Sequence, residues 1–150
     1  MHINCGGNEI TVDGNTTYQD DKEPRGASMF YSHPSQEWAF SSTGNFMDDD
    51  SEADSYTKTN KSAISNVSAT IAQLYTTARV SPLSLTYYGL CLMNGNYTVK
   101  LHFAEIIFTN DSSLTSLGKR IFDVYIQVTK LLHTILKKRV CLNFISILVN

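Results

Sequence analysis

The sequence has few charged residues, and this shortage favours some fold classes over others. Charged residues make up 17% of the 150 residues, below the roughly 25% that is typical of soluble domains. Serine, threonine and asparagine together account for 42 residues. This composition suits a β-sandwich with hydroxyl-rich strands and turns, and it does not suit a helical bundle. We therefore expect one all-β domain that is long enough to bury a real core.

Several catalytic and metal-binding signatures are also missing. The three cysteines lack the spacing of a zinc site, and no G-x-S-x-G nucleophile motif occurs. The acidic run Asp48–Asp54 alternates like the start of a calcium loop, but Ala53 and Thr59 stand where an EF-hand needs glycine and glutamate. The sequence thus predicts neither an enzyme nor a metal site, and it calls for no cofactor.

Long apolar runs and a leader segment are absent too. The mostly apolar segment Val140–Val149 has ten residues, whereas a membrane-spanning helix needs roughly 20. Met1–Cys5 enters a strand-like segment at once, with no secretory signal before it. We expect either a cytosolic chain or one whose start has been lost.

The net charge of −2 hides an uneven distribution. Residues 1–127 hold 8 Lys/Arg and 14 Asp/Glu, a balance of −6, whereas residues 128–150 hold 4 Lys/Arg and no acid. The acidic part argues against a nucleic-acid partner, because phosphate binding needs a basic surface.

The clearest predicted strand is Tyr97–Phe103, where apolar and polar residues alternate after the turn Asn94–Asn96. Tyr18–Phe30, with its charges, proline and glycine, is predicted to be a loop. Other segments have the pattern of short strands between turn signals, and they are His2–Gly7, Glu9–Val12, Thr70–Val80, Leu85–Leu92 and Ile121–Ile126. Many short strands with turns between them predict a β-sandwich or jelly roll.

Five longer motifs occur in a characteristic order. They are Ile3–Gly7, Trp38–Gly44, Leu74–Gly89, Asn96–Glu105 and Phe122–Ile126. Residues 2–127 thereby resemble the malectin domain in the extracellular part of plant leucine-rich-repeat receptor-like kinases. The resemblance implies a β-sandwich related to carbohydrate-binding modules. It also implies a place outside the cell, between leucine-rich repeats and a membrane helix that precedes a kinase; this chain contains none of these neighbours.

The resemblance further implies a sugar site on loops at one end of the sandwich. Phe108 and Phe46 fall on aromatic positions of the animal member of the family, whereas Ile107 and Val80 fall where that protein has tyrosines. Its aspartate would lie beyond residue 127. The known site is therefore not transferred intact.

Aromatic side chains elsewhere are further candidates for stacking on a sugar ring, because they combine a flat apolar face with a hydroxyl group. These candidates are Tyr75, Tyr87 and Tyr88. For any one of them, packing in the core or at a sheet edge is the competing interpretation. Trp38 is predicted to be a core residue.

Two kinds of modification are predicted. Cys5 and Cys91 lie in the β-like part and are candidates for a disulfide. Five asparagines match the N-glycosylation pattern, which favours maturation in the secretory pathway over a merely Asn/Ser/Thr-rich surface. They are Asn15, Asn60, Asn66, Asn96 and Asn110.

Residues 128–150 do not follow the family pattern. One interpretation is an amphipathic helix, with Val128, Leu131, Leu132 and Ile135 at helical spacing. The other interpretation, which we favour, is that the tail is translated intron. The family match breaks off at a valine, and every valine codon begins with GT, the usual first two nucleotides of an intron. Without the family's last strands a sheet edge would be left unpaired; the tail either covers this edge or the product is unstable.

The sequence therefore predicts a noncatalytic, C-terminally truncated malectin module of a plant receptor, located on the extracellular side of the plasma membrane. Its expected partners are an oligosaccharide or cell-wall glycan, or other receptor ectodomains, and it would meet a membrane only through parts missing from this chain. The alternatives are a protein-interaction module that binds no sugar, and an unstable truncated gene product.

Overall fold

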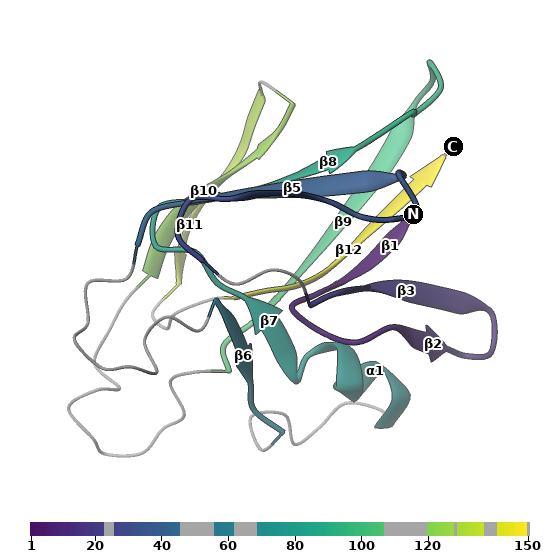
Figure 1. Cartoon of the computed structure of the whole chain (residues 1–150), viewed down its shortest axis with the longest axis horizontal. Coiled ribbons are helices and arrows are strands. Elements are labelled where there is room, and N and C mark those ends of the chain that lie inside the picture. Colours follow the sequence, from purple (N-terminus) through teal and green to yellow (C-terminus); the bar gives the residue numbers. More distant parts are fainter. Residues whose placement is uncertain are drawn as a thin grey trace.

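A computed structural model describes residues 1–22, 26–45, 56–61, 69–106, 120–127, 129–136 and 141–149 (Figure 1). Strands dominate these residues, and they form a seven-stranded, a three-stranded and a two-stranded sheet. The predicted all-β fold class is confirmed.

The seven-stranded sheet contains both ends of the described chain. Its strands are β1 (His2–Cys5), β2 (Ile10–Val12), β3 (Thr16–Asp21), β6 (Thr57–Thr59), β7 (Thr77–Arg79), β9 (Tyr97–Ala104) and β12 (Cys141–Val149). They follow the order β2-β3-β1-β12-β7-β6, with β9 also paired to β12. Among these pairs, β1 and β3 are parallel and the others are antiparallel.

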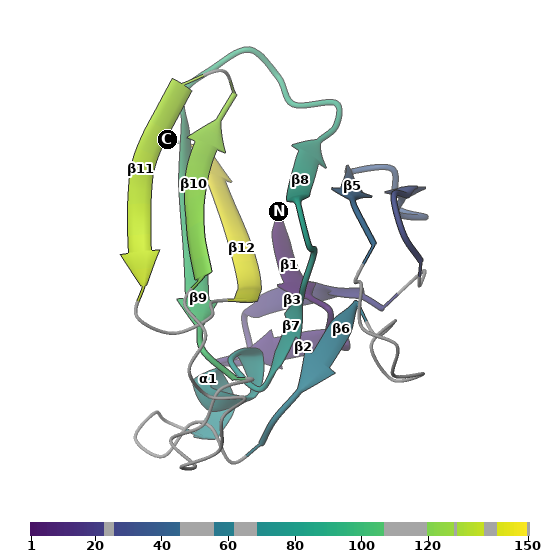
Figure 2. The same ribbon diagram turned by 90° about the vertical axis from the view of Figure 1, so that its left-hand side faces the viewer.

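The three-stranded sheet consists of β4 (Phe30–Ser32), β5 (Trp38–Thr43) and β8 (Ser84–Gly89). Its inner face packs on the seven-stranded sheet, because Trp38 and Phe40 share a fully buried cluster with Ile3 and Cys5 of β1. Leu85 and Tyr87 of β8, and Val99 and Leu101 of β9, pack against the same cluster. The two sheets therefore form a sandwich (Figures 1 and 2).

The third sheet is the hairpin of β10 (Arg120–Ile126) and β11 (Thr129–Leu136). Figure 2 shows it as a separate pair of strands. Phe122 of β10 contacts Phe103 of β9, with ring centroids 5.3 Å apart, so this hairpin packs against the larger sheet.

Two of the predicted element assignments are wrong. Thr70–Val80 is not one strand, because a helix, α1 (Ala69–Leu74), precedes β7. Its apolar positions Ile71, Leu74 and Tyr75 have the i, i+3, i+4 spacing of a helix, and Leu74 is buried. The predicted loop Tyr18–Phe30 begins inside β3 and ends at the first residue of β4.

The tail forms strands, so the amphipathic helix considered for residues 128–136 is wrong. Instead, β11 completes the hairpin and β12 lies between β1 and β9 in the larger sheet. Ile145 pairs with Ile3 on one side and Leu101 on the other. The tail thus pairs the edges that would otherwise be open, as one interpretation of the sequence expected. The boundary after residue 127 and its origin in an intron stay predictions.

A buried ion pair within the seven-stranded sheet also contacts the three-stranded sheet. Arg79 of β7 donates from Nε to Asp21 Oδ2 and from Nη2 to Asp21 Oδ1, both at 2.7 Å, and the side chains are 2% and 0% exposed. Asp21 Oδ2 also accepts from the Tyr87 hydroxyl at 2.5 Å and from the Gly6 N–H at 3.2 Å. The Arg79 guanidinium lies 4.2 Å from the centre of the Phe40 ring. Strands from both sheets therefore meet at this carboxylate.

The predicted disulfide between Cys5 and Cys91 is wrong, because both cysteines are free. Cys5 is fully buried beside Asp21 and Tyr87, whereas Cys91 is exposed in the loop after β8. Burial raises the pKa of the Cys5 thiol well above its usual value, and the Asp21 carboxylate raises it further. The thiol consequently stays protonated and acts as a small core side chain.

The ion pair makes Asp21 the most sensitive acidic position of the described core. Asp21→Asn should lower the free energy of unfolding by about 3–5 kcal/mol, because it leaves the Arg79 charge buried without its partner. Asp20→Asn is the matched control: its side chain is 47% exposed and lies 3.6 Å from His33, so the loss should stay below about 1 kcal/mol. Denaturant titration measures both, and equal losses would contradict the assignment.

A proline in β12 tests whether the tail belongs to the sheet. Ile145→Pro should lower the free energy of unfolding by at least about 2 kcal/mol, because proline cannot donate in a strand ladder that is paired on both sides. Ile145→Val keeps the N–H and the β-branched shape, and should remain close to the parent chain. If the proline variant unfolds like the parent chain in a thermal scan, β12 does not stabilise the domain.

Candidate ligand-binding surface

Among the predicted binding residues that the structure describes, Tyr88 is the most exposed. It lies on β8 with 41% of its surface exposed, and its hydroxyl is 3.0 Å from Ser41 Oγ of β5. Phe30 of β4, which is 66% exposed, contributes a second ring whose centroid is 6.2 Å from that of Tyr88. Sequence analysis missed Phe30, because it ended a predicted loop; only its pairing with Ser41 places it on the sheet.

Tyr87 points the other way, because successive residues of a strand face opposite sides. Its ring lies between Trp38 and Phe40, with centroids 6.0 and 5.9 Å away, and its hydroxyl donates to Asp21. Burial raises the pKa of Tyr87 well above its usual value, and the Asp21 carboxylate adds to this. Tyr87 therefore remains a protonated donor with a structural role.

Tyr75 belongs to a second, half-buried group. Its ring packs with Tyr18 against Val12 and Leu74, and its hydroxyl is 2.8 Å from His102 Nδ1. Burial raises the pKa of Tyr75 and lowers the pKa of His102, which Lys100 lowers further. Both groups are neutral at pH 7, so their contact is an ordinary hydrogen bond that joins the segment after α1 to β9.

The loop positions suggested by the family resemblance gain no support. Val80 is 2% exposed and packs with Ala78 and Ile106, so it offers no surface to a ligand. Phe46, Ile107 and Phe108 lie outside the described residues, as does the acidic run Asp48–Asp54.

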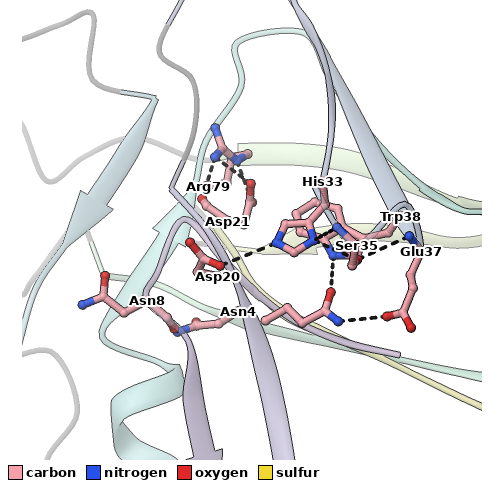
Figure 3. A network of polar contacts seen from close by, with 10 residues as sticks. Asn4, Asn8, Asp20, Asp21, His33, Ser35, Glu37, Trp38 and Arg79 are labelled. Carbon is pink, nitrogen blue, oxygen red and sulfur yellow. Dashed lines mark hydrogen bonds and ion pairs between the residues drawn. The ribbon is translucent and has the colours of Figure 1, made fainter.

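A polar network covers the edge of the core near the turn that precedes β5 (Figure 3). His33 stacks on the buried Trp38 with ring centroids 4.9 Å apart, and its Nδ1 is 2.8 Å from Ser35 Oγ. Ser35 Oγ also accepts from the Glu37 N–H at 3.3 Å, and His33 Nε2 lies 3.6 Å from Asp20. His33 Nδ1 also accepts from the Ser35 N–H at 3.2 Å, so the histidine and the serine both bind backbone N–H groups of this turn and cap it.

The buried Trp38 anchors that network from below. Its Nε1 donates to Gln19 Oε1 at 2.5 Å, and Gln19 Nε2 donates to Glu37 Oε2 at 2.9 Å. The prediction of Trp38 as a core residue is confirmed, since it is 0% exposed. Within the residues that the structure describes, no group of His, Cys, Asp and Glu is arranged to hold a metal ion.

The glycosylation candidates differ in their surroundings. Asn15, in the turn between β2 and β3, and Asn96, just before β9, are exposed. Asn60 is half-buried, and its Nδ2 donates to the Ile106 carbonyl at 2.8 Å. Asn66 and Asn110 lie outside the described residues. A glycan on Asn60 would have to occupy space beside this bond, so the folded domain favours Asn15 and Asn96 as acceptors.

Expression through a secretory host tests this order. We expect high occupancy at Asn15 and Asn96 and low occupancy at Asn60, measured by mass spectrometry of glycopeptides. Thr17→Ala and Thr98→Ala, which remove the two sequons but keep the asparagines, should each eliminate one glycan and serve as site controls. High occupancy at Asn60 in soluble, folded protein would contradict the structural argument.

Comparison with known proteins identifies the family of this all-β domain. The Malectin domain family model matches residues 1–135, so the chain belongs to the malectin domain family. The match extends into β11. No solved structure matches the chain.

Several relatives are plant receptor kinases. One probable LRR receptor-like serine/threonine-protein kinase of Arabidopsis thaliana is 63% identical over 128 residues, which are 85% of this chain and 13% of that protein. A second from the same plant is 46% identical over 127 residues, which cover 85% of this chain and 12% of that protein. The chain thus spans about an eighth of their length. It corresponds to their malectin region and contains no kinase domain.

Proposed function

We propose that the chain is a noncatalytic, carbohydrate-binding module in the ectodomain of a plant receptor-like kinase. Membership of the malectin family and the receptor kinases among its relatives support the ectodomain role. The observation that supports a sugar ligand is the exposed aromatic pair Phe30 and Tyr88 beside the Ser41 hydroxyl. Aromatic faces bind the C–H faces of sugars, and hydroxyl groups bond to sugar hydroxyls.

This role places the module on the extracellular side of the plasma membrane, with glycans or other receptor ectodomains as partners. Two sequons on exposed turns are compatible with passage through the secretory pathway. No helix in the part of the chain that the structure describes is long and apolar enough to cross a membrane.

Binding to a panel of plant cell-wall oligosaccharides tests the proposal. The purified 150-residue chain is applied to an array of immobilised glycans and then studied by calorimetry. It should bind at least one class of oligosaccharide in a saturable manner. The control is the same chain after it has been unfolded in denaturant and returned to buffer under conditions that prevent refolding. Absence of saturable binding across the panel, with circular dichroism showing a folded β protein, would refute sugar binding.

A protein-interaction module is the second candidate. The observation that favours it is the loop between β8 and β9, where Leu92 is 47% and Met93 is 83% exposed. Exposed apolar side chains at a loop tip are suited to a protein partner. If this candidate is correct, the folded chain should bind no glycan of the panel but should bind a receptor ectodomain. Met93→Ser should weaken that binding.

A further inference from the structure

We propose that the sugar-binding site is the outer face of the three-stranded sheet β4-β5-β8, and that its ligand is an uncharged oligosaccharide lying across the strands. The inference rests on the proposed function. It differs from the resemblance-based expectation, which placed the site on loops at one end of the sandwich. The outer face consists of Phe30 and Ser32, Ala39, Ser41 and Thr43, and Ser84, Thr86 and Tyr88.

The register assigns these residues to one face. Phe30 pairs with Ser41, which pairs with Thr86, and Ala39 stands between Ser32 and Tyr88 in the next outward row. Directly paired residues share a face of a sheet. The intervening row, Tyr31, Phe40 and Tyr87, packs on the core, so the outward rows are the opposite face.

The two aromatic rings lean toward each other over the central strand. Phe30 is on β4 and Tyr88 on β8, which flank β5 and are therefore roughly 10 Å apart across the sheet. Their ring centroids are nevertheless only 6.2 Å apart. The rings therefore contact each other at an interplanar angle of 54°, and Ala39 on the same face is 0% exposed.

Hydroxyl groups surround this aromatic surface. Ser32, Thr43, Ser84 and Thr86 are exposed, and the Ser41 and Tyr88 hydroxyls are within hydrogen-bond distance of each other. Hydroxyls both donate and accept, which matches the hydroxyls of a sugar that stacks on the rings. This combination of stacking and two-way hydrogen bonding is the chemistry that a sugar requires.

Charge on the strands specifies the ligand further. β4, β5 and β8 contain no charged residue, although the chain carries 26 Asp, Glu, Lys and Arg in all. An acidic sugar would find no cation on these strands to pair with its carboxylate. The face is therefore complementary to a neutral chain, and less so to a uronic-acid chain or to the charged rim of a protein partner.

The strands of this face are held from behind by the core. Behind it, Trp38 and Phe40 are fully buried and Tyr87 is bonded to Asp21. A preformed surface loses little conformational entropy on binding. The outer face can therefore bind a sugar chain without first having to order its strands.

The experiment compares aromatic variants on and off this face in the full 150-residue chain. Phe30→Ala and Tyr88→Ala should each weaken binding of the best neutral oligosaccharide about tenfold or more by calorimetry. Tyr125→Ala removes a tyrosine that is 57% exposed on β10, in a different sheet, and should change the affinity less than twofold. A uronic-acid oligosaccharide of equal length should bind the parent chain at least tenfold more weakly than the neutral one.

A second pair of variants separates loss of the site from loss of the fold. Thr86→Arg places a bulky side chain on the outer face without removing either ring and should abolish binding, whereas Thr11→Arg, at an exposed position of β2, should not.

If the parent chain binds sugar and the outer-face variants bind equally well, the site is wrong and the proposed function stands. If the folded parent chain binds no sugar, the proposed function and this inference both fail. If the uronic-acid chain binds as tightly as the neutral chain, the assignment of an uncharged ligand is overturned.

Discussion

The arrangement of the two layers depends on the buried Asp21 carboxylate, which pairs with Arg79 in its own sheet and accepts a hydrogen bond from Tyr87 of the three-stranded sheet. Both side chains are buried, and the carboxylate accepts from Arg79 of β7, from Tyr87 of β8 and from the Gly6 N–H that follows β1. Burial raises the pKa of the Asp21 carboxyl, while these three donors act in the opposite direction. A buried charge is tolerated only when its partners are in place, so the group specifies how the sheets meet.

That constraint gives the three-stranded sheet two faces with different roles. Tyr87 is held inward by Asp21, and the alternation of the strand therefore turns Tyr88 outward. The aromatic residues of the inner face, with Trp38 and Phe40, form the core, while the outer face keeps hydroxyls and two exposed rings. Neighbouring tyrosines that look equivalent in the sequence thus differ in function because one of them completes a buried polar group.

Much of the fold was predictable from the sequence, and the failures have identifiable causes. Strands with clear alternation, such as β9, and strands bounded by glycine, such as β1, were predicted nearly at their observed bounds. Asp20 and Asp21 gave β3 the pattern of a loop, because the charge that pairs with the buried Asp21 carboxylate comes from Arg79, 58 residues away. The segment at α1 was assigned to a strand although its apolar spacing is helical. Of the candidate site, Tyr88 was predictable as an aromatic residue, whereas Phe30 was not, because its exposure depends on pairing with β5.

The sequence by itself determined the all-β class, the malectin family and the absence of a kinase domain from this chain, since composition, alternation and ordered motifs are local properties of the chain. Tertiary structure alone decided that Cys5 and Cys91 are separate, that residues 141–149 pair between β1 and β9, and which tyrosines face solvent. Each of these outcomes depends on contacts between residues far apart in the sequence. Such contacts arise from sheet register and from the pairing of buried charge, which no local pattern encodes.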